Sequence, residues 1–335
     1  MRILLATERY DYGRPELGDS YPVQSFLGPL RRLGHDVALF DTFDPRFEGD
    51  PSVVGEALLA EARSTHPDLV LFMLHGHEVP TATLDRLRQL CATVNWFTDD
   101  SWRFRSYSSG LAGHFDAVLT TCRRAHRAYG RMAGVRALFC PWGFDSEVFH
   151  PVKVEPVVDV LFVGQRYGRR GAVVDHLRRS GLVVRAIGRG WQDSKVTPEE
   201  LAPLVASARV HLSFLDSSAG PLRRSGINLS GTWRADQMLG RLVPPQRQMK
   251  ARVFEVAGAG GFQLAPLVPE VDECLKMGRE LDLMGPVRSL ARRIRSLLAD
   301  DAHRSTIATA GYQRAVAEHT YERRFTQVFV DLGLP

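Results

Sequence analysis

Two cations in the second half of the chain lie where they could bind a phosphate group. Lys250 and Arg252 stand directly before residues 253–257, whose apolar pattern predicts a helix. The positive end of a helix dipole and two charge-assisted donors would together favour an anion at this point. Lysine is scarce, since only four of the 43 basic residues are lysines. A phosphate site is therefore favoured over the alternative that both are ordinary surface residues.

A second cationic segment follows a predicted strand at residues 157–163. Gly164 opens a loop that carries Arg166 and Arg170, and guanidinium groups beside a glycine turn suit a diphosphate. The loop contains neither a Walker motif nor the Gly-x-Gly-x-x-Gly of dinucleotide sites. It therefore predicts a phosphate cradle of a different kind.

The first half of the chain presents acids after one of its predicted strands. Asp99 and Asp100 follow residues 93–97, and the carboxyl ends of strands in doubly wound folds are where ligands collect. One of the two could act as a general base, or Asp100 could cap the next helix. The sequence leaves these alternatives open.

Histidines and tyrosines follow two other predicted strands of this half. His75 and His77 come after residues 69–74, where they could orient a ligand. A third metal ligand is missing from the His-x-His pattern, so no metal site is predicted. Tyr10 and Tyr12 lie in the loop after the first predicted strand and are expected on the same ligand side.

Strands and helices alternate through both halves, and this alternation must position the residues above. The predicted strands span residues 2–6, 37–40, 69–74, 93–97 and 115–121, and then 157–163, 182–187, 210–214 and 261–265. Such spacing predicts parallel sheets with right-handed crossovers. We expect an α/β fold of two doubly wound Rossmann-like domains facing across a cleft. We also expect a linker between the domains near residue 150 and a long loop at residues 216–248.

Composition narrows the class of protein. The chain has 335 residues, enough for two domains. Its longest apolar run, residues 69–74, is far shorter than the roughly 20 residues of a membrane span, and no signal peptide is recognisable, so a cytoplasmic protein is expected. The four cysteines are widely spaced and fit no metal pattern. The net charge of +5 leaves an anionic partner or peripheral membrane contact open, but the scattered arginines indicate no nucleic-acid site.

Several blocks of the second half resemble the CgeB-like (spore maturation protein) branch of the GT-B glycosyltransferases, glycosyl transferases group 1. These blocks are residues 160–164, 250–255 with the glycines that follow, 278–283, 307–312 and 319–324. Their order matches the family over roughly residues 157–325. In the first half, residues 95–100 and 141–149 are similar to the family more loosely.

The resemblance implies a bacterial glycosyltransferase of hexosyltransferase type that uses a nucleotide-diphosphate sugar. A UDP-sugar is favoured as donor, an unidentified hydroxyl on a small molecule, glycan or peptide is the acceptor, and neither cofactor nor metal is required. Residues 151–315 would bind the donor, residues 1–150 the acceptor, and a helix in residues 316–335 would pack back on the first domain.

The same resemblance suggests roles for individual residues. Glu255 would accept hydrogen bonds from the donor ribose, Gly260 and Gly261 would admit the donor close to the backbone, and Lys250 would assist departure of the diphosphate. The Glu255 helix resembles that of retaining enzymes, so retention is predicted. Such enzymes carry a second glutamate seven residues earlier, where this chain has Gln248.

Three other functions would leave different marks on the sequence. A dinucleotide-dependent oxidoreductase is disfavoured, because the loop after Ala6 lacks the required glycines although Asp41 ends the second predicted strand. A nucleic-acid-binding module would predict strongly salt-dependent binding to any DNA. A catalytically silent, transferase-like binding or assembly protein stays open.

Overall fold

The computed structural model describes residues 1–193, 196–217 and 246–335. The chain divides into two compact units. Unit 1 comprises Met1–Pro141 and Tyr321–Pro335, and unit 2 comprises Trp142–Thr320. The expected boundaries near residues 150 and 315 lie inside unit 2. Most of the expected loop at residues 216–248 lies outside the described residues.

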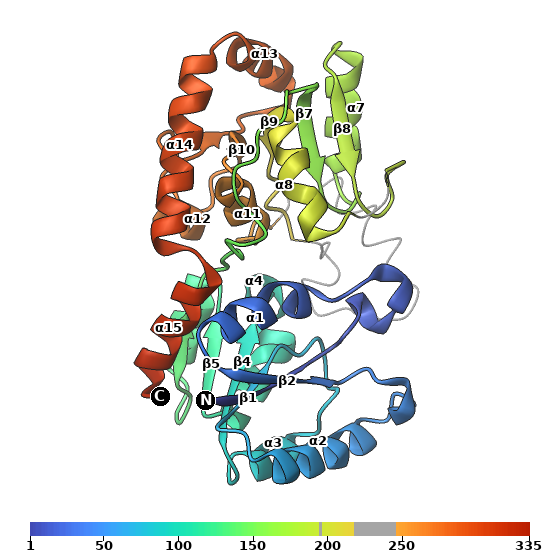
Figure 1. The fold of residues 1–335 in the computed structure, drawn as a ribbon, viewed down its shortest axis with the longest axis vertical. Coiled ribbons are helices and arrows are strands. Elements are labelled where there is room, and N and C mark those ends of the chain that lie inside the picture. Colours follow the sequence, from blue (N-terminus) through green and yellow to red (C-terminus); the bar gives the residue numbers. More distant parts are fainter. Residues whose placement is uncertain (194–195, 218–245) are drawn as a thin grey trace. The chain divides into compact units, whose positions relative to one another are not determined.

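Unit 1 is built on a parallel sheet of six strands in the order β2-β1-β3-β4-β5-β6 (Figure 1). The strands are β1 Arg2–Thr7, β2 Asp36–Asp41, β3 Leu69–Phe72, β4 Ala92–Phe97, β5 Ala117–Thr120 and β6 Ala137–Phe139. The first five agree with the sequence pattern, and β6 is a short strand that the pattern did not predict.

Helices connect these strands. They are α1 Tyr21–Arg32, α2 Pro51–Thr65, α3 Thr81–Leu87, α4 Asp100–Arg103, α5 Ser109–Leu111, α6 Arg123–Tyr129 and α15 Tyr321–Leu332. Short 3₁₀ helices are η1 Asp11–Gly13, η2 Pro15–Leu17, η3 Pro45–Phe47 and η5 Ala112–His114, and η4 Phe104–Ser108 is a short π-helix. Capping residues explain where these helices begin, as at α2. The Asp50 side chain accepts from the Ser52 N–H at 2.8 Å, and Pro51 fits the first helical position.

Two apolar layers cover the unit 1 sheet. On one face, buried residues of α2 and α3 such as Leu58 and Leu84 pack against the strands, and Figure 1 shows these two helices side by side. On the other, Phe26 of α1 stacks on Trp96 with ring centroids 5.2 Å apart and meets Phe325 of α15 at 5.3 Å. The last helix of the chain therefore completes the core of unit 1.

Unit 2 contains a parallel sheet of five strands in the order β11-β10-β9-β7-β8. The strands are β7 Val158–Val163, β8 Val184–Ile187, β9 Ala208–Leu212, β10 Gln263–Ala265 and β11 Asp282–Leu283. The helices are α7 Arg170–Arg179, α8 Pro198–Ala206, α11 Arg252–Gly258, α12 Pro269–Cys274, α13 Val287–Leu298 and α14 Asp301–Glu318. The two doubly wound, α/β units confirm the predicted fold class.

Each sheet has one point where the direction of winding reverses. In unit 1 the chain forms β2 on one side of β1 and then β3 on the other. In unit 2 it forms β8 on one side of β7 and then β9 on the other. Ligands of open α/β sheets bind beside the carboxyl ends of the strands at such switch points. The residues that follow β1, β3, β7 and β9 therefore lie where a ligand would bind.

Candidate functional site

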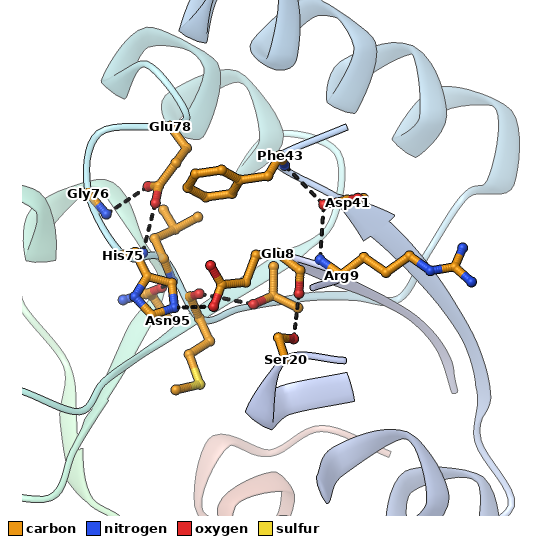
Figure 2. Close-up of polar contacts among 12 residues, drawn as sticks. Glu8, Arg9, Ser20, Asp41, Phe43, His75, Gly76, Glu78 and Asn95 are labelled. Carbon is orange, nitrogen blue, oxygen red and sulfur yellow. Dashed lines mark hydrogen bonds and ion pairs between the residues drawn. The ribbon is translucent and has the colours of Figure 1, made fainter. Parts of the chain in front are cut away.

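The switch point of unit 1 holds a histidine–carboxylate pair. Glu8 follows β1 and is 3% exposed, and its Oε1 lies 2.8 Å from Nε2 of His75, which follows β3. The His75 side chain itself is 42% exposed. Figure 2 shows the Glu8 carboxylate pointing toward the His75 ring. A buried acid thus holds one nitrogen of an accessible imidazole.

The backbone around His75 is held by side chains on both sides. The Glu78 carboxylate accepts from the backbone N–H groups of His75 at 3.0 Å and Gly76 at 2.8 Å (Figure 2). The Arg103 guanidinium donates to the His75 carbonyl at 2.6 Å. These bonds fix the turn in one geometry, which is what a reacting side chain requires of its support.

Neighbouring charges set the protonation of this histidine. Burial lowers the pKa of His75, but the hydrogen bond and charge of Glu8, with the charges of Glu78 and Asp99, outweigh that effect and raise it above its ordinary value. The imidazole is therefore a stronger base than a solvated histidine, because three carboxylates stabilise its protonated form.

The two aspartates after β4 differ in environment. Asp100 is 1% exposed and accepts from the Tyr129 hydroxyl at 3.1 Å. Burial raises the pKa of Asp100 to about 6, although hydrogen bonds from Ser108, Thr120 and Tyr129 oppose the rise. Asp99 is half-buried and acts electrostatically on His75. Of the two predicted catalytic acids, the structure brings only Asp99 to the histidine.

Of the other residues expected to bind the acceptor, namely Tyr10, Tyr12 and His77, only Tyr12 lies beside His75. The Tyr12 ring is 53% exposed, and its centroid lies 6.2 Å from that of His75. Tyr12 has φ of 56°, which is rare for a bulky residue and characteristic of functional loops. Tyr10 instead forms a bridge with Asp19, and His77 packs against Tyr107 at 5.2 Å.

In unit 2, the loop after β7 is braced by the loop after β8. Gly164 donates its N–H to the Ile187 carbonyl at 2.8 Å, and Trp191 Nε1 donates to the Gly164 carbonyl at 2.8 Å. A side chain at Gly188 would place its Cβ 2.8 Å from the Gly164 oxygen. The guanidinium of Arg166 lies 5.2 Å from the Trp191 ring centroid and is half-exposed.

Arg170 has a different setting from Arg166. It is 6% exposed and donates to the Gln165 carbonyl at 3.1 Å and the Phe214 carbonyl at 3.3 Å. Its guanidinium also lies 3.8 Å from the Tyr167 ring centroid. These bonds tie the loop after β7 to the loop after β9, so Arg170 shapes the switch point. That it also binds a phosphate stays a prediction.

Cations surround one acid at this switch point. Burial raises the pKa of Asp216, while the positive charges of Arg170, Arg247, Lys250 and Arg169 oppose that rise. Lys250 therefore lies within electrostatic reach of the loops that end β7 and β9. The four cations outnumber the single acid, which makes this region suited to a polyanion.

The residues after Lys250 form an ion pair inside the unit. Arg252 lies 2.6 Å from the carboxylate of Glu255, and Glu255 is 2% exposed. Both belong to α11, whose start is on the same side of the sheet as the end of β9, because α11 leads into the parallel neighbour β10. The ribose role of Glu255 stays a prediction.

The predicted glycines lie at the other end of α11. Gly260 and Gly261 directly precede β10, at the amino end of the sheet. A Cβ at Gly261 would lie 2.6 Å from a Val205 methyl group, so close packing explains the absence of a side chain there. The structure does not bring these two glycines together with Lys250.

The sequence reading missed Glu8, Glu78 and Asp216. Glu8 is the first charged residue after β1 and Asp216 closely follows β9, so position after a strand was an available signal. It was not sufficient, because many polar residues follow strands and only the strand order shows which of them flank a switch point.

The described residues contain neither a cluster of metal ligands nor a membrane-spanning helix. No group of three or more histidine, cysteine, aspartate or glutamate side chains there could hold a metal ion. In the same part of the chain, none of the helices combines the length and hydropathy that a membrane span requires.

Comparison with known proteins places these units in a fold family. Residues 169–329 match a family model described as glycosyl transferase-like, and no curated protein matches the chain. Sucrose-phosphate synthase from Thermosynechococcus elongatus superposes with a TM-score of 0.67 at 12% identity, over 99% of both chains.

Two further structures show the same likeness. HepE from Anabaena, in complex with UDP and glucose, superposes with a TM-score of 0.62 at 14% identity over 99% of both chains. A glycosyltransferase from Rickettsia africae gives 0.62 at 9% identity over 98% of this chain and 97% of that one. The fold is thus that of the GT-B glycosyltransferases, and the match over residues 169–329 supports a sugar transferase.

Proposed function

We propose that this chain transfers a sugar from a nucleotide-diphosphate donor to an acceptor hydroxyl, with unit 2 binding the donor and unit 1 the acceptor. The observation that carries the proposal is the set of cations around Asp216, Lys250 among them, at the switch point of unit 2. A polyanionic ligand fits that charge and that place. A UDP-sugar is the favoured donor, since the Anabaena HepE structures hold UDP or UDP-glucose.

In this proposal Lys250 supplies the main electrostatic contribution to the reaction. Negative charge accumulates on the departing diphosphate as the bond to the sugar breaks, and a fixed cation stabilises that charge without a metal ion. Arg166 and the backbone of Gly164 would contact the diphosphate, and Glu255 the ribose. Assignment to the CgeB-like branch and retention at the anomeric carbon stay predictions of the resemblance.

A thermal-unfolding screen tests the proposal. UDP, GDP, dTDP, ADP and CMP are added to the wild-type chain with and without EDTA. A nucleotide present at 100 times its dissociation constant adds about 2.7 kcal/mol to the free energy of unfolding. We expect UDP to raise the melting temperature of the wild type despite EDTA, and the rise to be lost in Lys250→Ala.

The matched control is Lys276→Ala, which removes a half-exposed lysine 3.9 Å from Asp272. It should keep the response to UDP. If no nucleotide stabilises the wild type, the donor site is wrong and a catalytically silent binding protein becomes the better account. If stabilisation requires a divalent metal, the metal-free part of the proposal fails.

A further inference from the structure

We propose that α13 and residues 283–286 before it form a surface that binds membranes containing anionic phospholipids. This α13 surface lies entirely within unit 2 and uses none of the residues proposed to bind the donor, so the inference goes beyond the proposed sugar transfer and does not depend on it. The argument depends on the charges of α13, on exposed apolar residues beside them and on a groove that both line.

Helix α13 has one basic side and one apolar side. It contains four arginines and no acidic residue. Arg288, Arg292 and Arg295 are exposed, and their spacing of four and then three residues places them on the same side of the helix. The apolar side packs into the core of unit 2 through four residues, Leu290, Ala291, Ile294 and Leu297. The helix therefore turns its basic side to solvent.

The charge of these arginines is not compensated. Among the described residues, Arg288 and Arg292 take part in no hydrogen bond or ion pair. Arg295 donates to the carbonyl of Ser180, and a carbonyl leaves the guanidinium charge in place. Ser180 directly follows Arg179, the exposed last residue of α7. Positive charge therefore continues from α13 to the end of α7.

The acids close to α13 in the sequence are engaged elsewhere. Asp282 lies 2.7 Å from Arg293, the fourth arginine of the helix. Asp300 accepts from a backbone N–H at the start of α14, where the helix dipole favours a negative charge. Asp301 pairs with Arg304. These acids therefore leave the charge of Arg288 and Arg292 available to an outside anion.

Apolar side chains are exposed beside the basic side. Leu283 of the edge strand β11 is 42% exposed, and Val287 at the start of α13 is 43% exposed. Pro286 is also exposed. Apolar residues next to cations are typical of surfaces that enter the boundary between lipid headgroups and acyl chains. This combination favours a membrane over a nucleic acid, whose phosphates would engage only the arginines.

A groove of about 440 Å³ joins the basic and apolar parts. Its lining includes the apolar side chains of Leu283 and Pro286 and the polar side chains of Ser289, Arg292 and Ser296. A phosphate group in the groove would meet a guanidinium and hydroxyl donors, and hydrocarbon would meet the leucine and the proline. The groove therefore offers each part of an anionic phospholipid a chemically matched contact.

Sedimentation with lipid vesicles tests the proposal on the full chain. We expect the wild type to bind vesicles of phosphatidylglycerol and phosphatidylcholine in equal amounts and not vesicles of phosphatidylcholine alone. Added salt should weaken this binding, because it screens the charges. Arg288→Gln combined with Arg292→Gln should weaken binding about 25-fold, since each arginine near an anionic surface contributes roughly fivefold. Val287→Ser should weaken it about fivefold through lost apolar contact.

The matched control for charge is Arg127→Gln combined with Arg131→Gln, which removes two exposed arginines of unit 1 and the same net charge. Val53→Ser is the matched control for apolar contact, since Val53 is 45% exposed in α2. Both controls should bind vesicles like the wild type. All the variants should keep their response to UDP, which separates the α13 surface from the donor site.

Several outcomes would overturn the proposal. They are equal binding of the wild type to both kinds of vesicle, no binding to either, and equal losses in the two arginine double variants. Duplex DNA that binds as tightly as the anionic vesicles, and loses affinity in the α13 double variant, would assign the surface to nucleic acid. A wild-type dimer that the same variant converts to a monomer, in gel filtration, would assign the surface to a second copy of the chain.

Discussion

The two switch points share a topology and differ in chemistry. In unit 1 the residues after β1, β3 and β4 bring carboxylates to an imidazole, and their charges raise the pKa of His75. In unit 2 the residues after β7 and β9 gather arginines and a lysine around one acid, Asp216. The strand order creates the same kind of edge twice. Side chains alone make one edge suited to protons and the other to a polyanion.

The way each region is held in place also differs. Unit 1 uses side chains to hold backbone, as Glu78 does with the N–H groups of His75 and Gly76. Unit 2 also uses side chains, since Trp191 and Arg170 bond carbonyls of the loop after β7, but it adds a close backbone contact between Gly188 and Gly164 that only glycine allows. A substitution in unit 1 should therefore act through the side-chain bonds of the His75 turn, and one at Gly188 of unit 2 through the backbone of two loops.

The largest effect should come from removing Lys250, the cation proposed to face the diphosphate. We expect Lys250→Ala to reduce kcat for UDP release from UDP-glucose by about 10²–10³-fold, because fixed charge at a departing group contributes that much. Steady-state kinetics measure it, with Lys276→Ala as the control that stays near the wild-type rate. A higher KM at unchanged kcat would show instead that Lys250 binds the donor equally in ground and transition states.

Asp100 should make the stability of unit 1 depend on pH. Its pKa is raised to about 6 from 3.8, so the folded state binds the proton more tightly than the unfolded state. The protonated carboxyl contributes up to about 3 kcal/mol to the free energy of unfolding at pH values below 3.8, its pKa in the unfolded chain. This contribution is lost as the pH rises through about 6, its pKa in the folded protein. Urea unfolding near pH 4 and pH 7 should show the loss in wild type and not in Asp100→Asn. If the free energy of unfolding changed equally with pH in the wild type and in Asp100→Asn, Asp100 would not be the source of the pH dependence.

Gly188→Ala should damage unit 2 through its backbone. Gly188 has φ of 122°, and the new Cβ would lie 2.8 Å from the Gly164 oxygen. We expect a loss of about 2 kcal/mol in the free energy of unfolding, with weaker UDP binding, since carbonyl oxygen cannot yield as a flexible side chain would. Gly181 has φ of 83° with open space around it, so Gly181→Ala should cost about 1 kcal/mol. Equal losses would show that the contact between loops is unimportant.

The smallest effect concerns the ribose. If Glu255 contacts the ribose as proposed, Glu255→Gln should weaken UDP binding about tenfold, or about 1.4 kcal/mol, because a charged acceptor for the ribose hydroxyls is lost. Calorimetry with UDP and with 2′,3′-dideoxy-UDP separates this from a general effect, since the variant and the wild type should bind the dideoxy ligand alike. The exposed Glu199 of α8 gives the control, Glu199→Gln. An equal loss for both ligands would mean that the Arg252–Glu255 pair is structural.

The alternation of strands and helices could be predicted from the sequence, because buried parallel strands are short apolar runs between amphipathic helices. The ends of the longer strands could be predicted to within about two residues, and with them the placing of His75, Asp99 and Gly164 after strands, whereas the short strands β6 and β11 were not predicted. The fold class followed from these local patterns. The helix expected within residues 316–335 is α15, which begins at Tyr321 after α14 ends at Glu318.

The environments of residues of the same type that lie close together in the sequence could not be predicted from the sequence. Asp99 and Asp100 are adjacent, yet one acts on His75 and the other is buried against Tyr129. Arg166 and Arg170 share a segment, yet one is half-exposed and the other bonds backbone carbonyls inside the unit. The direction of a side chain decides these cases, and it depends on packing with distant elements.

The sequence by itself determined the secondary structure, the parallel sheets and the scarcity of lysine that makes Lys250 conspicuous. Tertiary structure alone decided that Glu8 lies under His75, since β1 and β3 are far apart along the chain and become neighbours only through the order of the strands. The physical reason is that burial and charge coupling depend on distance in space. A carboxylate raises the pKa of an imidazole only when folding has brought the two together and excluded water from the acid.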